Sequence, residues 1–240
     1  MIDWLRKEIS DPSIEVDGCT LPIVIRRHAR ARRLTMRLAA DGSEVRVTLP
    51  TWGRTRDALV FAEARRDWIA QQLDCIPDAM PVEPGGYLSY RGRDLVIAWD
   101  GKARRTPTLA GDTLHIGGPR EGLDRRIQRW LEGEALRLMG EDLPFYTDRA
   151  GLPLPQLRLS RAKRRWGSCS GKGCIRLNWR LVQAPDHVRR SVVAHEVAHL
   201  VHFDHSPAFH ALLARLFEQD IAPADRWLKE HGRALYAQFG

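Results

Sequence analysis

The stretch Ser191-Val-Val-Ala-His-Glu-Val-Ala-His-Leu-Val201 decides the fold, because it places the spacing His-Glu-x-x-His on an apolar helix. His195 and His199 share one helical face, so both imidazoles can bind one zinc ion at about 2.1 Å. Glu196 lies about 100° further round the helix, where it can reach a water but not the metal. Two hydrogen-bonded core histidines would explain neither Glu196 nor the histidines that follow. The stretch therefore predicts an interior helix with two ligands and a general base.

A third metal ligand is expected just after this helix. Catalytic zinc takes three protein ligands and leaves a fourth position open. Ser206-Pro207 is typical of the start of a new helix that runs to about residue 218, so His205 lies in a connection that can turn back to the metal. His202 would support the ligands from the end of the first helix, and His210, inside the second helix, is the reserve candidate for the third ligand or for a supporting position. The sequence predicts one Zn²⁺ per chain, bound by His195, His199 and His205.

The composition is that of a globular protein with a strong positive charge. The chain has 240 residues, of which 43% are hydrophobic, and a net charge of +8. No apolar run is long enough to cross a membrane, and the first ten residues lack the apolar core of a signal peptide, so a cytoplasmic location is expected. Four irregularly spaced cysteines favour free thiols over disulfides.

The positive charge predicts attraction to polyanions. Its densest cluster is Arg26-Arg-His-Ala-Arg-Ala-Arg-Arg33. This cluster would give at most a weak nucleic-acid contact, and a solvated strand edge is the favoured interpretation.

Hydrophobic periodicity divides the chain into three expected parts. Alternating residues predict a hairpin over 33–49, and helical spacing predicts a helix over 54–73. Short strands are expected between 87 and 116, before the break Gly117-Gly118-Pro119, and a helix is expected over 123–139. We therefore expect an N-terminal extension (1–20), a β-rich region with one long helix (21–118) and a catalytic domain (119–240).

A second constellation precedes the metal helix, at Lys163-Arg-Arg-Trp-Gly-Ser-Cys-Ser170 and Cys174-Ile-Arg-Leu-Asn178. A Gly-Lys-Gly turn between the two runs predicts a hairpin. Its free edge could pair with an extended peptide, or its arginines could hold phosphate oxygens. A surface hairpin with a core tryptophan is the alternative. The candidate substrate-binding residues are Arg164, Arg165, Trp166, Ser168, Arg176 and Asn178.

The runs 165–170, 175–178, 192–200 and 204–209 together resemble the YgjP-like metal-dependent hydrolases, relatives of the SprT and WLM metallopeptidases. The resemblance implies His195, His199 and His205 as ligands and Glu196 as the base. It also implies an α+β zincin (gluzincin-like) fold, with a small, mostly antiparallel sheet over the metal helix and a β-rich region before it. Where the family commonly has tryptophan after the phenylalanine, this chain has His210.

Three functions are compatible with these patterns. The leading one is a zinc-dependent metallopeptidase that acts on a peptide or protein with a Glu-activated water. The second is a metal-dependent nucleoside triphosphate (UTP-type) pyrophosphatase, with Arg164, Arg165 and Arg176 as phosphate clamps. The third is a polyanion- or DNA-associated protein with a structural metal.

Overall fold

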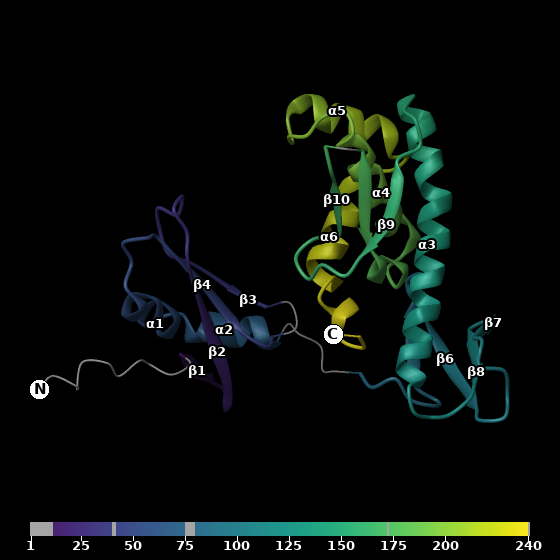
Figure 1. Ribbon diagram of the computed structural model, residues 1–240, viewed down its shortest axis with the longest axis horizontal. Helices are drawn as coiled ribbons and strands as arrows, with labels where there is room; N and C mark the ends of the chain where they lie inside the picture. The colour runs from purple at the N-terminus through teal and green to yellow at the C-terminus, as the bar shows by residue number, and fades with distance from the viewer. Residues whose placement is uncertain (1–11, 40–41, 75–79, 172, 240) are drawn as a thin grey trace, which may run out of the picture. The chain divides into compact units, whose positions relative to one another are not determined.

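The chain divides into two compact units at residues 78/79, as seen in a computed structural model that describes residues 12–39, 42–74, 80–171 and 173–239 (Figure 1). The expected boundary at 118/119 instead lies inside the second unit. The reason is that the strands before it share one hydrophobic core with the helix after it, through Leu114 and Ile116 on one side and Ile127 and Leu131 on the other.

The first unit is a four-stranded sheet with two helices. Strands β1 (Ser13–Val16), β2 (Cys19–Arg27), β3 (Thr35–Leu38) and β4 (Val45–Leu49) lie in the order β1-β2-β4-β3. Part of the expected extension 1–20 is therefore a strand, and residues 1–11 lie outside the described part. The antiparallel β3–β4 pair confirms the predicted hairpin. The single helix predicted over 54–73 is two helices, α1 (Thr55–Glu63) and α2 (Arg66–Asp74); no glycine or proline marks the break.

The second unit begins with a sheet of the same topology. Strands β5 (Tyr87–Tyr90), β6 (Arg93–Asp100), β7 (Thr108–Ala110) and β8 (Thr113–Gly117) lie in the order β5-β6-β8-β7. Both sheets pair antiparallel, parallel and antiparallel in that order. Each opens with a hairpin whose two turn residues have positive φ, Asp17-Gly18 and Arg91-Gly92. The two sheets therefore repeat one design that their sequences do not reveal.

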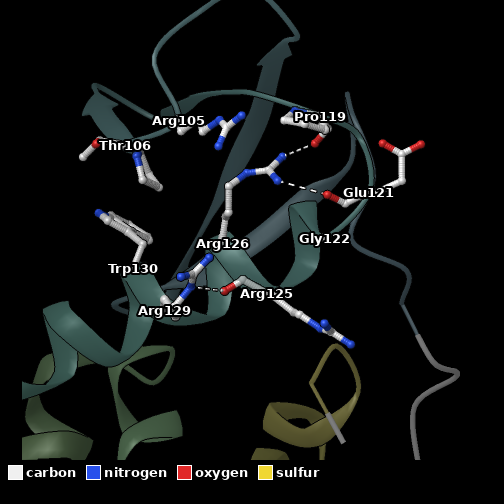
Figure 2. A pocket seen from close by; sticks show the side chains of 10 residues that line it. Arg105, Thr106, Pro119, Glu121, Gly122, Arg125, Arg126, Arg129 and Trp130 are labelled. Atoms are coloured by element: carbon white, nitrogen blue, oxygen red, sulfur yellow. Dashed lines mark hydrogen bonds between the residues drawn. The ribbon is translucent and has the colours of Figure 1, made fainter.

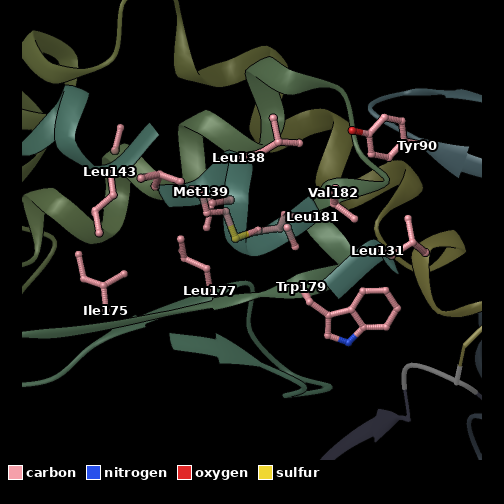
Figure 3. Close-up of a cluster of buried hydrophobic side chains, with 14 of the residues drawn as sticks. Tyr90, Leu131, Leu138, Met139, Leu143, Ile175, Leu177, Trp179, Leu181 and Val182 are labelled. Carbon is pink, nitrogen blue, oxygen red and sulfur yellow. The ribbon is translucent and has the colours of Figure 1, made fainter. Parts of the chain in front are cut away.

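The long helix α3 (Leu123–Ala150) forms the spine of the second unit. It continues beyond the expected end near residue 139 because Leu143, Tyr146 and Thr147 extend its buried face past Pro144. Figure 3 shows this face packing against β11 (Cys174–Asn178) and the short 3-10 helix η1 (Trp179–Val182).

A three-stranded sheet lies beside the metal helix. Strands β9 (Gln156–Ser160), β10 (Gly167–Cys169) and β11 have the order β10-β11-β9. β10 is antiparallel to β11, but β9 is parallel to it, so the expected antiparallel sheet is a mixed one. The reason is that residues 161–166 carry the chain past β11 to the outer edge, so β9 and β11 run in the same direction.

The remaining helices complete an α+β fold. They are α4 (Asp186–Ala198), which carries the metal motif, α5 (Pro207–Leu216), α6 (Ile221–His231) and the 3-10 helix η2 (Ala234–Tyr236). Within the described ranges, every helix is too short or too polar to span a lipid bilayer.

The β5–β6 turn fixes the start of α4. The backbone N–H of Arg91 donates to Val182 O at 2.8 Å, and the Arg91 guanidinium pairs with Asp186, the first residue of α4. A Cβ on Gly92 would lie 2.7 Å from Pro185, so only glycine allows this close approach. The sheet thereby sets where the metal helix begins.

Candidate metal centre

Three imidazoles converge at the C-terminal end of α4. His195 Nε2 lies 3.1 Å from His199 Nε2 and 3.2 Å from His205 Nε2. Tetrahedral zinc with Zn–N bonds of 2.0–2.1 Å would separate its ligand nitrogens by about 3.3 Å. The structure therefore brings together the three histidines predicted as ligands, with a spacing that fits one zinc ion.

A backbone carbonyl orients His199. Its Nδ1 lies 2.9 Å from the carbonyl oxygen of His202, which can only accept a hydrogen bond, so Nδ1 carries the proton. The lone pair is then on Nε2, the atom that faces the other histidines. His202 thus contributes its carbonyl, and its side chain is not part of the three-histidine group.

The electrostatics also suit metal binding. Burial and the neighbouring histidines lower the pKa of His195 to about 4. The imidazole is therefore neutral at pH 7, which is the form that binds metals.

A buried aromatic ring packs against all three histidines. Phe209 is fully buried, and its ring centre lies 5.0, 4.6 and 4.8 Å from those of His195, His199 and His205. Ser206 caps α5 as expected and accepts the backbone N–H of Phe209 at 3.5 Å. The role of Phe209 was missed, because an apolar residue in a helix gives no sign that it packs on a metal site. His210 is exposed, and its ring centre is 6.4 Å from that of His205.

Glu196 is buried beside the histidines, with only 4% of the residue exposed. Its Oε2 is buried and has no hydrogen-bond partner among the described residues. Burial raises the pKa of its carboxyl to about 7, and the charge of Arg165 opposes that rise. Because a buried, unsatisfied carboxylate oxygen costs free energy, its persistence here points to a ligand or water that completes the site.

A cavity of about 250 Å³ opens beside Glu196 and His195. Its walls come from α4, from the residues leading into β10, and from α6. Most of the wall is apolar, with Arg165 and Asp225 as the charged members besides Glu196. The apolar wall side chains are those of Trp166, Val192, Ile221 and Leu228. Sequence reasoning missed α6, because nothing local links it to the metal helix.

Strand β10 offers a free edge next to Glu196. Trp166 O accepts from Asn178 N at 2.7 Å, and Ser170 N donates to Cys174 O at 3.0 Å. Bonded pairs alternate along an antiparallel ladder, so the N–H and C=O groups of Gly167 and Cys169 point away from β11. In the sheet as described, β10 has no second neighbour. These groups can pair with an extended peptide.

The predicted hairpin residues divide between two faces of the sheet. A Cβ on Gly167 would lie 2.3 Å from Glu196 Oε1, so this position faces the metal helix. Ser168 and its register partner Arg176 therefore face the opposite side. Arg165 and Trp166 line the cavity, whereas Arg164 is exposed and is not among the lining residues.

Asn178 has a structural position. It is fully buried, and its side-chain amide donates to Ala162 O at 2.9 Å and contacts Tyr236 Oη at 3.2 Å. Its oxygen accepts the N–H of Arg180 at 3.1 Å. With its hydrogen bonds satisfied inside the protein, Asn178 does not fit the substrate-binding role expected from the sequence.

A family model described as "YgjP-like, metallopeptidase domain" matches residues 32–231. The crystal structure of the metallopeptidase zymogen of Pyrococcus abyssi abylysin is similar over a region that covers 40% of this chain and 96% of the abylysin chain. That match has 24% sequence identity and a TM-score of 0.36, a likeness too weak to define the fold. No curated protein matches the sequence.

Proposed function

The chain belongs to the YgjP-like metallopeptidase-domain family, and from this premise we propose that it is a zinc-dependent peptidase with a gluzincin-like fold and three histidine ligands. His195, His199 and His205 would hold the metal, and Glu196 would act as the general base. The observation that carries the proposal is the convergence of three imidazole nitrogens beside a buried carboxylate oxygen without a partner.

In peptide hydrolysis, the bound zinc and Glu196 would have separate roles. A bound zinc ion supplies Lewis acidity, which polarises a peptide carbonyl and acidifies water. Glu196 Oε2 accepts the proton of the attacking water and returns it to the leaving amine. Its burial, with only 4% of the residue exposed, limits the contact of this carboxylate with bulk water.

Substrate binding is assigned to β10 and the cavity. The outward backbone groups of Gly167 and Cys169 would pair with an extended peptide and hold its scissile bond beside Glu196. Trp166, Val192 and Leu228 would enclose one side chain of the peptide. Apolar walls favour an apolar side chain.

The placement of the arginines does not favour the nucleotide pyrophosphatase. Of the three expected phosphate clamps, only Arg165 lines the cavity. Arg176 faces the other side of the sheet. The remaining positive charge near the site is too small to neutralise a triphosphate.

Zinc-loaded protein is expected to cleave peptides from an unbiased library, with an apolar residue at one fixed position next to the cut. The products are identified by mass spectrometry, and a panel of nucleoside triphosphates is incubated in parallel. Arg176→Ala should leave kcat/KM for a cleaved peptide unchanged, and Arg165→Ala should alter it only a few-fold. Triphosphate turnover that falls ten- to a hundredfold in Arg165→Ala, without any peptide cleavage, would replace the peptidase by the nucleotide hydrolase.

Gly167→Ala is expected to lower kcat/KM for peptide hydrolysis about a hundredfold, because its Cβ would lie 2.3 Å from Glu196 Oε1 and displacement of a catalytic group by about 1 Å has that effect. Zinc content and Tm are measured on the same samples. Gly171→Ala, in the same hairpin, is the matched control, since its Cβ would meet nothing within 4 Å. Equal activity of the two variants would show that close contact with Glu196 is unimportant.

A further inference from the structure

A second cavity, of about 710 Å³, lies at the N-terminal end of α3 (Figure 2). The β6–β7 connection, the β8–α3 connection and the first turns of α3 form it. Its principal lining side chains are Arg105, Thr106, Arg125, Arg126, Arg129 and Trp130.

This cavity is remote from the metal centre. α3 has 28 residues and is about 42 Å long. Its far end contacts α5, where the Arg149 guanidinium donates to Arg215 O at 2.8 Å. Figure 1 accordingly shows α5 at one end of α3 and the β6–β8 region at the other. The peptidase proposal makes no use of this cavity.

The cavity carries a local excess of positive charge. It is lined by four arginines and one carboxylate, that of Glu121, which points away from them in Figure 2. Other arginines of this unit are ion-paired, as Arg93 is with Asp112. Within the described part of the chain, no ion pair joins a carboxylate to any of the four.

Neutral groups hold two of these arginines in place. The Arg126 guanidinium donates to Glu121 O at 3.1 Å and to Pro119 O, and its Nε is buried without a partner in the described structure. Arg129 Nε donates to Arg125 O at 3.3 Å. Figure 2 shows these contacts as dashed lines. Carbonyl oxygens orient the guanidinium groups but leave their charge uncompensated.

The position of the arginines conflicts with helix electrostatics. Arg125, Arg126 and Arg129 lie in the first two turns of α3, where the helix dipole disfavours cations. Arg125 and Arg129 are also a like-charged pair four residues apart. A bound anion would remove both penalties, and violations of local preference mark functional sites.

We propose that this cavity binds an anion carrying two or more phosphate groups, through Arg105, Arg126 and Arg129. Guanidinium groups bind phosphate oxygens in pairs. Several arginines spread around an open cavity suit a chain of phosphates better than one small anion. The Thr106 hydroxyl can donate a further hydrogen bond. Free polyphosphates and the nucleic-acid backbone share this chemistry.

The test is titration calorimetry of zinc-loaded, full-length protein with tripolyphosphate and, separately, with a ten-nucleotide oligothymidylate. We expect at least one of them to bind saturably and more weakly as salt increases. Arg105→Ala/Arg129→Ala should weaken binding about tenfold or more. Both side chains are exposed, so the variant should fold, which Tm checks. Binding of only one probe identifies the source of the phosphates.

The matched control is Arg158→Ala/Arg176→Ala, which removes the same charge from exposed positions on the three-stranded sheet. This variant should bind as the wild type does. Equal weakening in both double variants would reduce the effect to attraction by net charge and overturn the proposal. Absence of saturable binding to either probe would overturn it as well. Tripolyphosphate can also chelate the bound zinc, but this contribution should be the same in every variant. A difference in binding between the variants therefore reports on the arginine cavity and not on the zinc.

Discussion

Glu196→Gln is expected to lower kcat for peptide hydrolysis by several orders of magnitude while zinc remains bound. Glutamine has the same shape, but its amide cannot accept the proton of the attacking water. The three histidines are unchanged, so metal affinity should persist. Activity is measured on a peptide cleaved by the wild type, and zinc by elemental analysis of the same samples.

A control and a stability measurement sharpen this test. Glu141→Gln, on the exposed side of α3, makes the same chemical change away from the metal and should keep full activity. Because Glu196 Oε2 is buried without a described partner, Glu196→Gln should unfold at the same temperature or a higher one. Substantial turnover by a zinc-replete Glu196→Gln would exclude Glu196 as the base.

His205→Ala is expected to remove zinc, with His210→Ala as the control that retains it. The nitrogen of His205 is 3.2 Å from that of His195, whereas His210 lies outside the three-histidine group. Loss of a direct ligand should weaken zinc more than the ten- to hundredfold seen when a residue that only orients a ligand is removed. Competition with a chelating dye measures the affinity.

Two outcomes would contradict this assignment. If zinc survives His205→Ala and is lost in His210→Ala, the third ligand is His210, and the connection between α4 and α5 must rearrange on binding. If both variants keep wild-type affinity, two histidines and a different group hold the metal. Each variant removes one exposed histidine, so the two variants have the same net charge.

The centre of the site was predictable because its parts are local in sequence. Helical spacing places His195, Glu196 and His199, and the Ser206-Pro207 helix start leaves His205 in the connection before α5. The structure brings these histidines together for the same geometric reasons. Local rules of this kind need no knowledge of distant contacts.

The walls of the site were not predictable, because they depend on tertiary packing. Gly167 had no assigned role within the predicted hairpin, yet glycine is required where β10 passes Glu196. Asn178 has a polar side chain that could bind a substrate, but its amide satisfies its hydrogen bonds inside the fold. Alternation identified strands without their partners, so neither the parallel β9–β11 pair nor the repeated four-stranded sheet could be derived.

The docking of the Arg91-Gly92 turn on the start of α4 has a consequence for the order of folding. Arg91 and Asp186 are 95 residues apart in sequence, so their contact closes a long loop and should form after the local hairpins and helices. This contact holds the first residue of the helix that carries His195 and His199. We therefore expect the metal site to assemble late in folding. Zinc binding followed during refolding would then report the last stage of folding and not its beginning.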